Sequence, residues 1–297
     1  MGKRGRRALG VLSILLWVLP VQAATVADMV GRRVKLRGSP RRIVSLAPSL
    51  TEILFALGAG DAVVGVTDYA DYPPEVRKKA RVGGGLDPNL EVIVTLRPDL
   101  VLASADTNRW ETLLQLERLH IPVFGVKPAG LEGVFTSIQK IGEVVGRLKQ
   151  AEALIATMRR RMAAAAEKVR GLTRLQVLYV IWVDPLIVAG QGTVIDDLIQ
   201  MAGGMNNVRV PGFPRYGLEQ VLIHPPDVIL LASDRGGLQD WKILRRLPAW
   251  KEIRAVREGA VRVIDPAVVN RPGPRIAEAV KLLASLLHPE AFRRGNP

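Results

Sequence analysis

The stretch from Arg147 to Arg170 contains neither glycine nor proline, and it constrains the fold of this chain more than any other feature. Its apolar residues follow one another in steps of three and four, which places them on one face of a helix: Leu148, Ala151, Ile155, Met158, Met162, Ala165 and Val169. Gly146 and Gly171 mark its ends. At 1.5 Å per residue the helix would be about 36 Å long, roughly the width of a small domain. A surface helix or short coiled coil has the same periodicity, so the flanking sequence must decide its role.

The size of the chain permits one large or two modest hydrophobic cores, because 48% of its 297 residues are hydrophobic. This composition excludes a disordered chain. The sequence has no cysteine, which removes disulfides, thiolate metal sites, cysteine catalysis and a lipid-anchored cysteine together.

Residues 1–23 have the pattern of a secretory signal peptide. Lys3, Arg4, Arg6 and Arg7 supply a basic start, 9–18 an apolar core, and 21–23 a small-residue cleavage site. An uncleaved anchor is the alternative, but the apolar core is shorter than the ~20 residues that span a bilayer. We therefore expect cleavage at Ala23 or Ala24 and a soluble periplasmic or secreted protein.

The chain is strongly basic, with a net charge of +14 that falls to about +10 once the four signal cations are removed. Nucleic acid, a membrane surface and an anionic ligand all attract such a charge. The basic residues are scattered along the sequence rather than grouped in a stripe with interleaved aromatics. We interpret them as a solvated surface and expect no nucleic-acid partner.

On both sides of the long helix, short apolar segments alternate with amphipathic ones. In the first half we expect strands at 42–47, 62–66, 100–103 and 121–126, and helices at 89–96, 108–119 and 131–145. In the second half we expect strands at 175–183, 186–188, 228–231 and 260–264, helices at 193–202, 218–223 and 275–287, and a helical region at 238–256. Such alternation is typical of a parallel sheet covered on both faces. The organisation predicted is a lobe at 24–146, a linking helix at 147–170 and a lobe at 171–297.

The start of the chain carries two further local signals. The segment 28–39 is predicted to be a short polar hairpin or arm. The sequence Ser49-Leu50-Thr51-Glu52 has the pattern of a capping box, in which the Ser49 hydroxyl and the Glu52 carboxylate bond to free amides at a helix start, and Gly58 would end that helix.

An internal repeat links the two halves. Leu90-Glu91 is followed after six residues by Pro98-Asp99 and an apolar segment, and Leu218-Glu219 is followed at the same spacing by Pro226-Asp227 and another. Both copies predict a short helix, a Pro-Asp turn and a buried strand. Two similar lobes on one linking helix are the simplest architecture with this repeat.

No catalytic or metal-binding set assembles from the sequence. His120, His224 and His288 each fall at the end of a predicted helix, where a polar ring is favoured structurally, and they are too scattered to hold a metal. The glycine clusters at 83–85 and 190–192 lack the full phosphate-binding patterns and are interpreted as turns. A secreted α/β enzyme therefore remains only the weaker alternative to a binding protein.

Aromatic residues make up 5% of the chain, and several fall in loops or at strand ends rather than inside elements; they are Tyr69, Tyr72, Trp110, Trp182, Phe213 and Tyr216. Ligands bind at the loops that follow the carboxyl ends of parallel strands. Two such sets, one from each half, would clamp a large flat ligand by stacking. Trp241 and Trp250 belong to amphipathic segments and are interpreted as packing residues.

The sequence resembles the periplasmic binding proteins for vitamin B12, iron siderophores and haem. The resemblance is carried by 40–49, 64–74, the two repeats, 247–250 and 259–261, and the B12-binding proteins are the nearest in pattern. It implies two Rossmann-like α/β lobes with parallel sheets, joined by one long rigid α-helix, as in class III binding proteins. It also implies a monomer that performs no chemistry, needs no cofactor or metal, and delivers its ligand to the permease of an ABC importer in the inner membrane.

The resemblance also assigns roles to individual residues. It implies that Glu91 and Glu219 dock onto arginines of the permease. Tyr69, Phe213 and the segment 267–271, which includes Asn270 and Arg271, correspond to ligand-contacting positions. Together with Tyr72, Trp182 and Tyr216, these are the ligand-binding residues that we expect.

Two departures from the B12 binders bear on the ligand. Glycines at 83–85 and valines at 268–269 stand where the best-known B12 binder has aromatics. Arg271, with Arg215 nearby, would suit the carboxylates of a ferric chelate or the propionates of haem. We therefore expect a corrinoid such as cobalamin, with a ferric siderophore or haem as the alternative.

Overall fold

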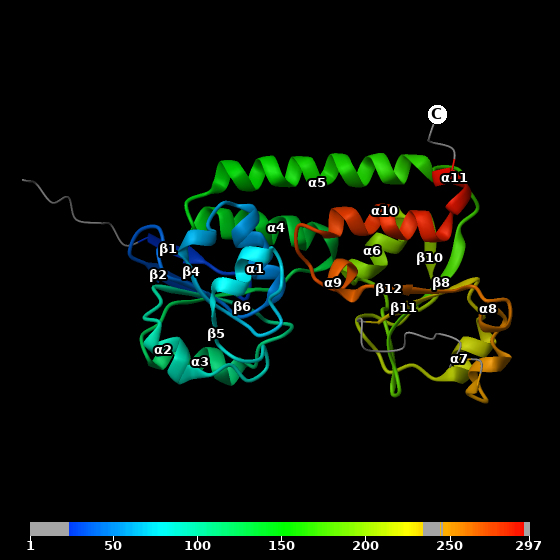
Figure 1. The fold of residues 1–297 in the computed structure, drawn as a ribbon, viewed down its shortest axis with the longest axis horizontal. Coiled ribbons are helices and arrows are strands. Elements are labelled where there is room, and N and C mark those ends of the chain that lie inside the picture. The colour runs from blue at the N-terminus through cyan, green and yellow to red at the C-terminus, as the bar shows by residue number, and fades with distance from the viewer. Residues whose placement is uncertain (1–23, 234–243, 245, 294–297) are drawn as a thin grey trace, which may run out of the picture.

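The protein is described by a computed structural model that covers residues 24–233, 244 and 246–293 (Figure 1). The predicted signal peptide at 1–23 lies outside the described residues, as do Trp241 and part of the helical region at 238–256. Within the described ranges, no helix combines the length and the apolar character that crossing a bilayer requires.

The first lobe is built on a five-stranded, all-parallel sheet with the strand order β5-β4-β3-β6-β7. Its strands are β3 (Ile43–Ser45), β4 (Val63–Val66), β5 (Ala80–Arg81), β6 (Leu100–Ser104) and β7 (Val123–Val126). Its helices are α1 (Pro48–Ala56), α2 (Leu90–Thr95), α3 (Trp110–Arg118) and α4 (Gly130–Val144). A separate antiparallel hairpin precedes them, made of β1 (Ala24–Ala27) and β2 (Arg33–Leu36), in the segment where the sequence predicts a hairpin.

Alternating side chains of this sheet enter two different cores. Ile43, Leu100 and Leu102 face a core that includes residues of α1 and α4, whereas Val44 and Val101 face one that includes residues of α2 and α3. Because both faces are covered, every residue of β6 is buried, which explains its continuous apolar sequence.

The second lobe repeats this plan with the strand order β10-β8-β11-β12, again parallel, and β9 pairs antiparallel with β8. Its strands are β8 (Leu175–Val183), β9 (Leu186–Val188), β10 (Gly204–Asn206), β11 (Val228–Ala232) and β12 (Val261–Ile264). Its helices are α6 (Val194–Met201), α7 (Leu218–Ile223), α8 (Arg254–Arg257), α9 (Pro266–Val269), α10 (Ile276–Leu287) and α11 (Pro289–Arg293). The sequence did not predict β5 or β10. Trp250 is 3% exposed and packs in the core, as expected.

The long helix is α5 (Leu148–Lys168), slightly shorter than predicted at each end. It lies along α4 of the first lobe and α10 of the second, and it spans both lobes along the top of Figure 1. Its apolar face, including Met158 and Met162, belongs to one hydrophobic core that continues from the first lobe into the second. The lobes also touch directly, because α4 packs against α6 and the Leu131 amide donates to Asp197 Oδ2 at 2.7 Å. The linking helix is therefore braced on both lobes.

The sequence repeat corresponds to an equivalent turn in each lobe. The Asp99 carboxylate accepts hydrogen bonds from the amides of Arg41 and Arg42 at 2.8 and 2.9 Å, directly before β3. The Asp227 carboxylate accepts from the amide of Gln176 at 2.8 Å, in β8. In both lobes the Pro-Asp turn therefore fixes the start of one sheet strand against its neighbour, which confirms that the two halves share a fold.

The predicted capping box is wrong. The helix begins at Pro48 with Ala47 at its N-cap, and no side chain caps it. Proline at the first position lacks an amide hydrogen, so that position needs no acceptor. Glu52 is therefore free for another role: it points out of α1 and bonds to arginines of the other lobe.

Candidate functional site

Four charged side chains meet where the two lobes touch, and we call them the junction cluster: Glu52, Asp71, Arg271 and Arg275. Glu52 lies in α1 and Asp71 in the loop after β4, whereas both arginines lie between α9 and α10 of the second lobe. These segments follow the carboxyl ends of β3, β4 and β12. The carboxyl edges of the two parallel sheets therefore face each other at the junction, and in sheets of this kind that edge is where ligands bind.

Glu52 is the centre of the junction cluster, with only 3% of its surface exposed. Arg275 donates to both of its carboxylate oxygens, at 3.0 Å from Nε and 2.6 Å from Nη2, and Arg271 Nη1 lies 3.5 Å away. A buried carboxylate is tolerated only when it is paired in this way. The hydrogen bond from Arg275 to Glu52 raises the pKa of Arg275 against the opposing effect of burial. The Arg275 guanidinium also stacks on the Tyr72 ring, 4.5 Å from its centroid.

Asp71 forms the outer part of the junction cluster. Arg271 Nη1 donates to Asp71 Oδ1 at 2.5 Å, and Nη2 donates to the backbone carbonyl of Tyr69 at 3.3 Å. Partial burial acts to raise the pKa of Asp71, but the hydrogen bond and the positive charge of Arg271 outweigh it, so this pKa lies below its ordinary value. Both cations of the junction cluster are therefore matched by carboxylates.

A pocket of 720 Å³ opens beside the junction cluster, between the lobes and the linking helix. Glu52, Tyr72 and Arg275 line it together with Met158 and Arg161 of α5. Tyr72 therefore faces the side of the junction where the linking helix runs.

Three of the predicted ligand-binding aromatics are largely exposed: Tyr69 at 70%, Trp182 at 61% and Phe213 at 58%. Tyr69 belongs to the first lobe, and Trp182 and Phe213 belong to the second. Tyr69 and Phe213 lie in loops and Trp182 lies near the end of β8, and exposed aromatic side chains of this kind are suited to stacking against a flat ligand. In the first lobe Leu86, which the sequence did not single out, is 57% exposed near this edge.

Asn108 fixes the loops of the first lobe at this edge. Its amide nitrogen donates to the carbonyls of Leu46 and Gly85, at 3.0 and 2.6 Å, while its oxygen accepts from the Ser104 amide at 2.7 Å. The side chain is buried, so one amide joins the ends of three chain segments. The loop that carries Leu86 is therefore held in place.

The other predicted ligand-binding residues have different surroundings. Asn270 caps the end of α9, and its Oδ1 accepts a hydrogen bond from the buried Tyr179 hydroxyl at 2.7 Å. Burial, followed by the charge of Asp265, raises the pKa of Tyr179, so that hydroxyl stays protonated. Tyr216 packs against the core of the second lobe and, with Arg215, lines a pocket of 820 Å³. Arg271 does not line that pocket.

The two glutamates of the repeat occupy equivalent places. Glu91 lies in the first turn of α2 and Glu219 in the first turn of α7, and both are exposed. Neither side chain makes an ion pair within the ranges that the structure describes. Figure 1 shows both helices on the side of the molecule opposite α5, one in each lobe.

The described residues contain no group of three or more His, Asp or Glu side chains that could hold a metal ion. His120 follows α3, and His224 and His288 cap α7 and α10, at the helix ends that the sequence predicted. Two α/β lobes on a braced linking helix, with their carboxyl edges facing each other, define a two-lobe binding protein.

The sequence comparisons identify the family. Residues 43–268 match the model of the family described as "Periplasmic binding protein", and the chain belongs to this family. It is 33% identical over 284 residues to the uncharacterized ABC transporter substrate-binding lipoprotein YvrC of Bacillus subtilis (strain 168), covering 93% of this chain and 88% of that protein. It is 30% identical over 257 residues to the vitamin B12-binding protein of Photorhabdus laumondii, covering 85% of this chain and 90% of that protein.

Among solved structures, the apo form of the periplasmic heme-binding protein RhuT from Roseiflexus sp. RS-1 aligns with a TM-score of 0.77 at 30% identity. That alignment covers 86% of this chain and all 100% of the RhuT chain. The family consists of substrate-binding proteins of ABC transporters, so the chain is not an enzyme.

Sequence reasoning missed three of the four residues of the junction cluster. Asp71 and Arg275 were not singled out, and Glu52 was assigned to a cap. One signal was available: Glu52 is the only charged residue in α1, whose other members are apolar or small, and a carboxylate on a helix with so little polar surface needs a partner from elsewhere.

Proposed function

We propose that this protein is extracytoplasmic, captures a corrinoid between its two lobes and delivers it to the permease of an ABC importer. The observation that carries the proposal is the set of largely exposed aromatics on both lobes, Tyr69 on one and Trp182 and Phe213 on the other. Large exposed aromatics are costly in water and are suited to a flat macrocycle. Relatives named as vitamin B12-binding proteins support a corrinoid.

The charges of the junction cluster favour a ligand with a neutral periphery. Arg271 and Arg275 are the cations of the junction cluster, and both are already paired with Asp71 and Glu52. The amide substituents of cobalamin need no free cation. A ligand carboxylate that bound Arg271 would have to displace Asp71 and leave that carboxylate unpaired.

Haem is the second candidate, and the similarity to a heme-binding protein of known structure favours it. The two ligands are distinguished by titrating the exported protein with cyanocobalamin, haemin and a ferric hydroxamate chelate while following tryptophan fluorescence. We expect saturable quenching by cyanocobalamin at micromolar concentration or below. Saturation by haemin or the chelate, with none by micromolar cyanocobalamin, would refute the corrinoid assignment.

The contacts are tested by calorimetric titration of single alanine variants of Tyr69, Trp182 and Phe213. Each should weaken cyanocobalamin binding by about tenfold, the effect of losing one stacked ring. Trp110→Ala is the control, because Trp110 is also 46% exposed but its ring is already covered by Arg32, 5.1 Å from the ring centroid. An equal loss in the control would show that the variants act through the fold.

Delivery to the permease involves Glu91 and Glu219. They stand at equivalent exposed positions, one on each lobe, so a permease with matching arginines would hold both lobes at once. Charge pairing across such an interface fixes the register of docking more than it adds affinity.

A further inference from the structure

The β1–β2 hairpin presents a row of cations that ligand capture does not use. Along β2 and the residue after it, exposed and buried positions alternate, so that Arg33, Lys35 and Arg37 point outward while Val34 and Leu36 are buried. Side chains two apart on a strand share a face and lie about 7 Å from each other. We call Arg33, Lys35 and Arg37 the hairpin cations.

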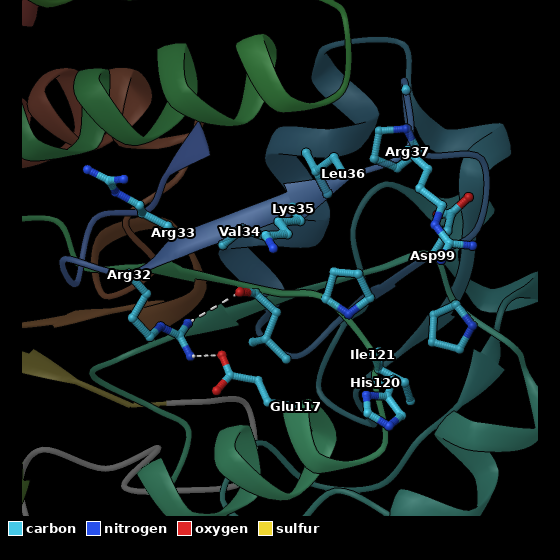
Figure 2. A pocket seen from close by; sticks show the side chains of 15 residues that line it. Arg32, Arg33, Val34, Lys35, Leu36, Arg37, Asp99, Glu117, His120 and Ile121 are labelled. Atoms are coloured by element: carbon cyan, nitrogen blue, oxygen red, sulfur yellow. Dashed lines mark hydrogen bonds and ion pairs between the residues drawn. The ribbon is translucent and has the colours of Figure 1, made fainter. Parts of the chain in front are cut away.

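A groove of 1110 Å³ lies beside the hairpin cations, between β2 and the starts of β6 and β7. Figure 2 shows Lys35 and Arg37 above this groove and His120 with Ile121 on its far side. His120 has a left-handed backbone, φ 59°, at the end of α3. Its side chain lines the groove.

The acidic residues of the groove are already engaged. Glu117 pairs with Arg32 at 2.8 Å, and the Asp99 carboxylate accepts from two backbone amides. In contrast, none of the hairpin cations forms an ion pair or a side-chain hydrogen bond with the described part of the chain. The hairpin face is therefore a local excess of unneutralised positive charge, carried by three cations within five residues of the sequence.

We propose that the hairpin face binds the headgroups of anionic phospholipids and holds the exported protein against the membrane surface. Charge complementarity is the first argument, since basic residues near an anionic bilayer are attracted to it over about a Debye length. The position of the face is the second. Its groove is bounded by Pro98 and Asp99, just beyond α2, so it flanks the helix that carries Glu91.

Retention at the membrane has a clear use for a protein of this kind. The relative YvrC is named a lipoprotein, whereas this sequence of 297 residues contains no cysteine to carry a lipid. A weak, reversible attraction to the bilayer would raise the concentration of the protein near its permease without anchoring it. The inference is independent of which ligand the protein carries.

The test is co-sedimentation of the exported protein with vesicles of phosphatidylcholine alone or mixed with one quarter phosphatidylglycerol. We expect binding to the anionic vesicles only, and its loss in concentrated salt because the charges are exposed. The triple variant Arg33→Ala, Lys35→Ala, Arg37→Ala should lower the partition coefficient on the order of 100-fold, about fivefold for each cation. Lys35→Ala alone should lower it about fivefold, which provides a second test if the triple variant does not fold.

The matched control removes three exposed cations of α5, Lys149, Arg160 and Arg161, by alanine substitution. It lowers the net charge equally and should change partitioning by less than about threefold, because charges more than a Debye length from the surface are screened. Equal losses in both triple variants would overturn the proposal, as would vesicle binding that the hairpin variant leaves unchanged. Binding of soluble polyphosphate without binding of anionic vesicles would also overturn it, because the partner would then be a soluble polyanion.

Discussion

The two lobes follow one plan but meet with opposite charges. In both, a short helix with an exposed glutamate leads through a Pro-Asp turn into a buried strand, and the strands β4-β3-β6-β7 of one lobe correspond to β10-β8-β11-β12 of the other. At the junction, however, the first lobe supplies carboxylates and the second supplies arginines. The repeat therefore explains how each lobe folds, and the departure from it explains how the lobes hold each other.

The largest expected effect is on uptake, and it tests whether both lobes contribute equally to docking through α2 and α7. The double variant Glu91→Lys, Glu219→Lys should reduce cellular uptake of labelled cyanocobalamin to background, because both ends of the docking surface would repel the permease. Ligand affinity measured by calorimetry should stay within about twofold, since neither helix lies at the facing edges. Uptake by the double variant at the parental rate would contradict the docking role. If only one of the single variants Glu91→Lys and Glu219→Lys reduced uptake, only the lobe that carries that residue would dock.

The next effect concerns the junction cluster, where the lobes differ. Glu52→Ala should lower the free energy of unfolding by about 3 kcal/mol, because it leaves two arginines without their buried partner. Glu132→Ala is the matched control: Glu132 pairs with Arg159, but the side chains are 70% and 54% exposed, so we expect about 0.5 kcal/mol or less. Urea unfolding measures both. Similar values for the two variants would mean that Glu52 contributes no more than a surface ion pair.

A smaller effect tests the turn that the lobes share. Asp99→Ala and Asp227→Ala should each cost about 1.5 kcal/mol in the free energy of unfolding. Asp99→Ala removes two charge-assisted hydrogen bonds from backbone amides, and Asp227→Ala removes one such bond and the ion pair with Arg254. The costs should agree within about 0.5 kcal/mol if the turns are energetically equivalent. Glu143→Ala, which removes an exposed pair with Lys140, serves as the control and should be close to neutral. If only one of the two substitutions lowered the free energy of unfolding, the two Pro-Asp turns would be equivalent in geometry but not in their contribution to stability.

The smallest effect is the pH dependence of the Arg271–Asp71 bridge. The pKa of Asp71 is lower when the protein is folded, so its stabilisation is complete above the ordinary carboxyl pKa and is lost as the pH falls through the lower folded value. The thermal midpoints of the parent and of Asp71→Asn should therefore differ by a constant amount between pH 8 and pH 5 and converge in acid, as the pH falls through the lowered pKa of Asp71. A difference that disappears between pH 8 and pH 6 would show that another group controls the bridge. The pKa of Arg275 is raised above an already high value, so it does not titrate in this range.

Most of the fold could be predicted from local patterns. The linking helix follows from apolar steps of three and four with glycines at both ends, and α7 and β9 have the predicted bounds. Short edge strands such as β5 and β10 were missed because two or three residues carry too little periodicity to be recognised. The sequence identified the exposed aromatics because the chain has few aromatic residues, so those in loops and at strand ends stand out.

What the sequence determined by itself is therefore the architecture: two α/β lobes, a helix between them and a repeated turn in each. Only the tertiary structure decided the junction, because Asp71 and Arg271 are 200 residues apart and no spacing rule connects them. It also decided which of the neighbouring cations are engaged: within the described ranges Arg33, Lys35 and Arg37 have no ion pair, while Arg32 beside them pairs with Asp28 and Glu117. Local periodicity shows which residues share an element, whereas the partner of a charge depends on how the elements pack.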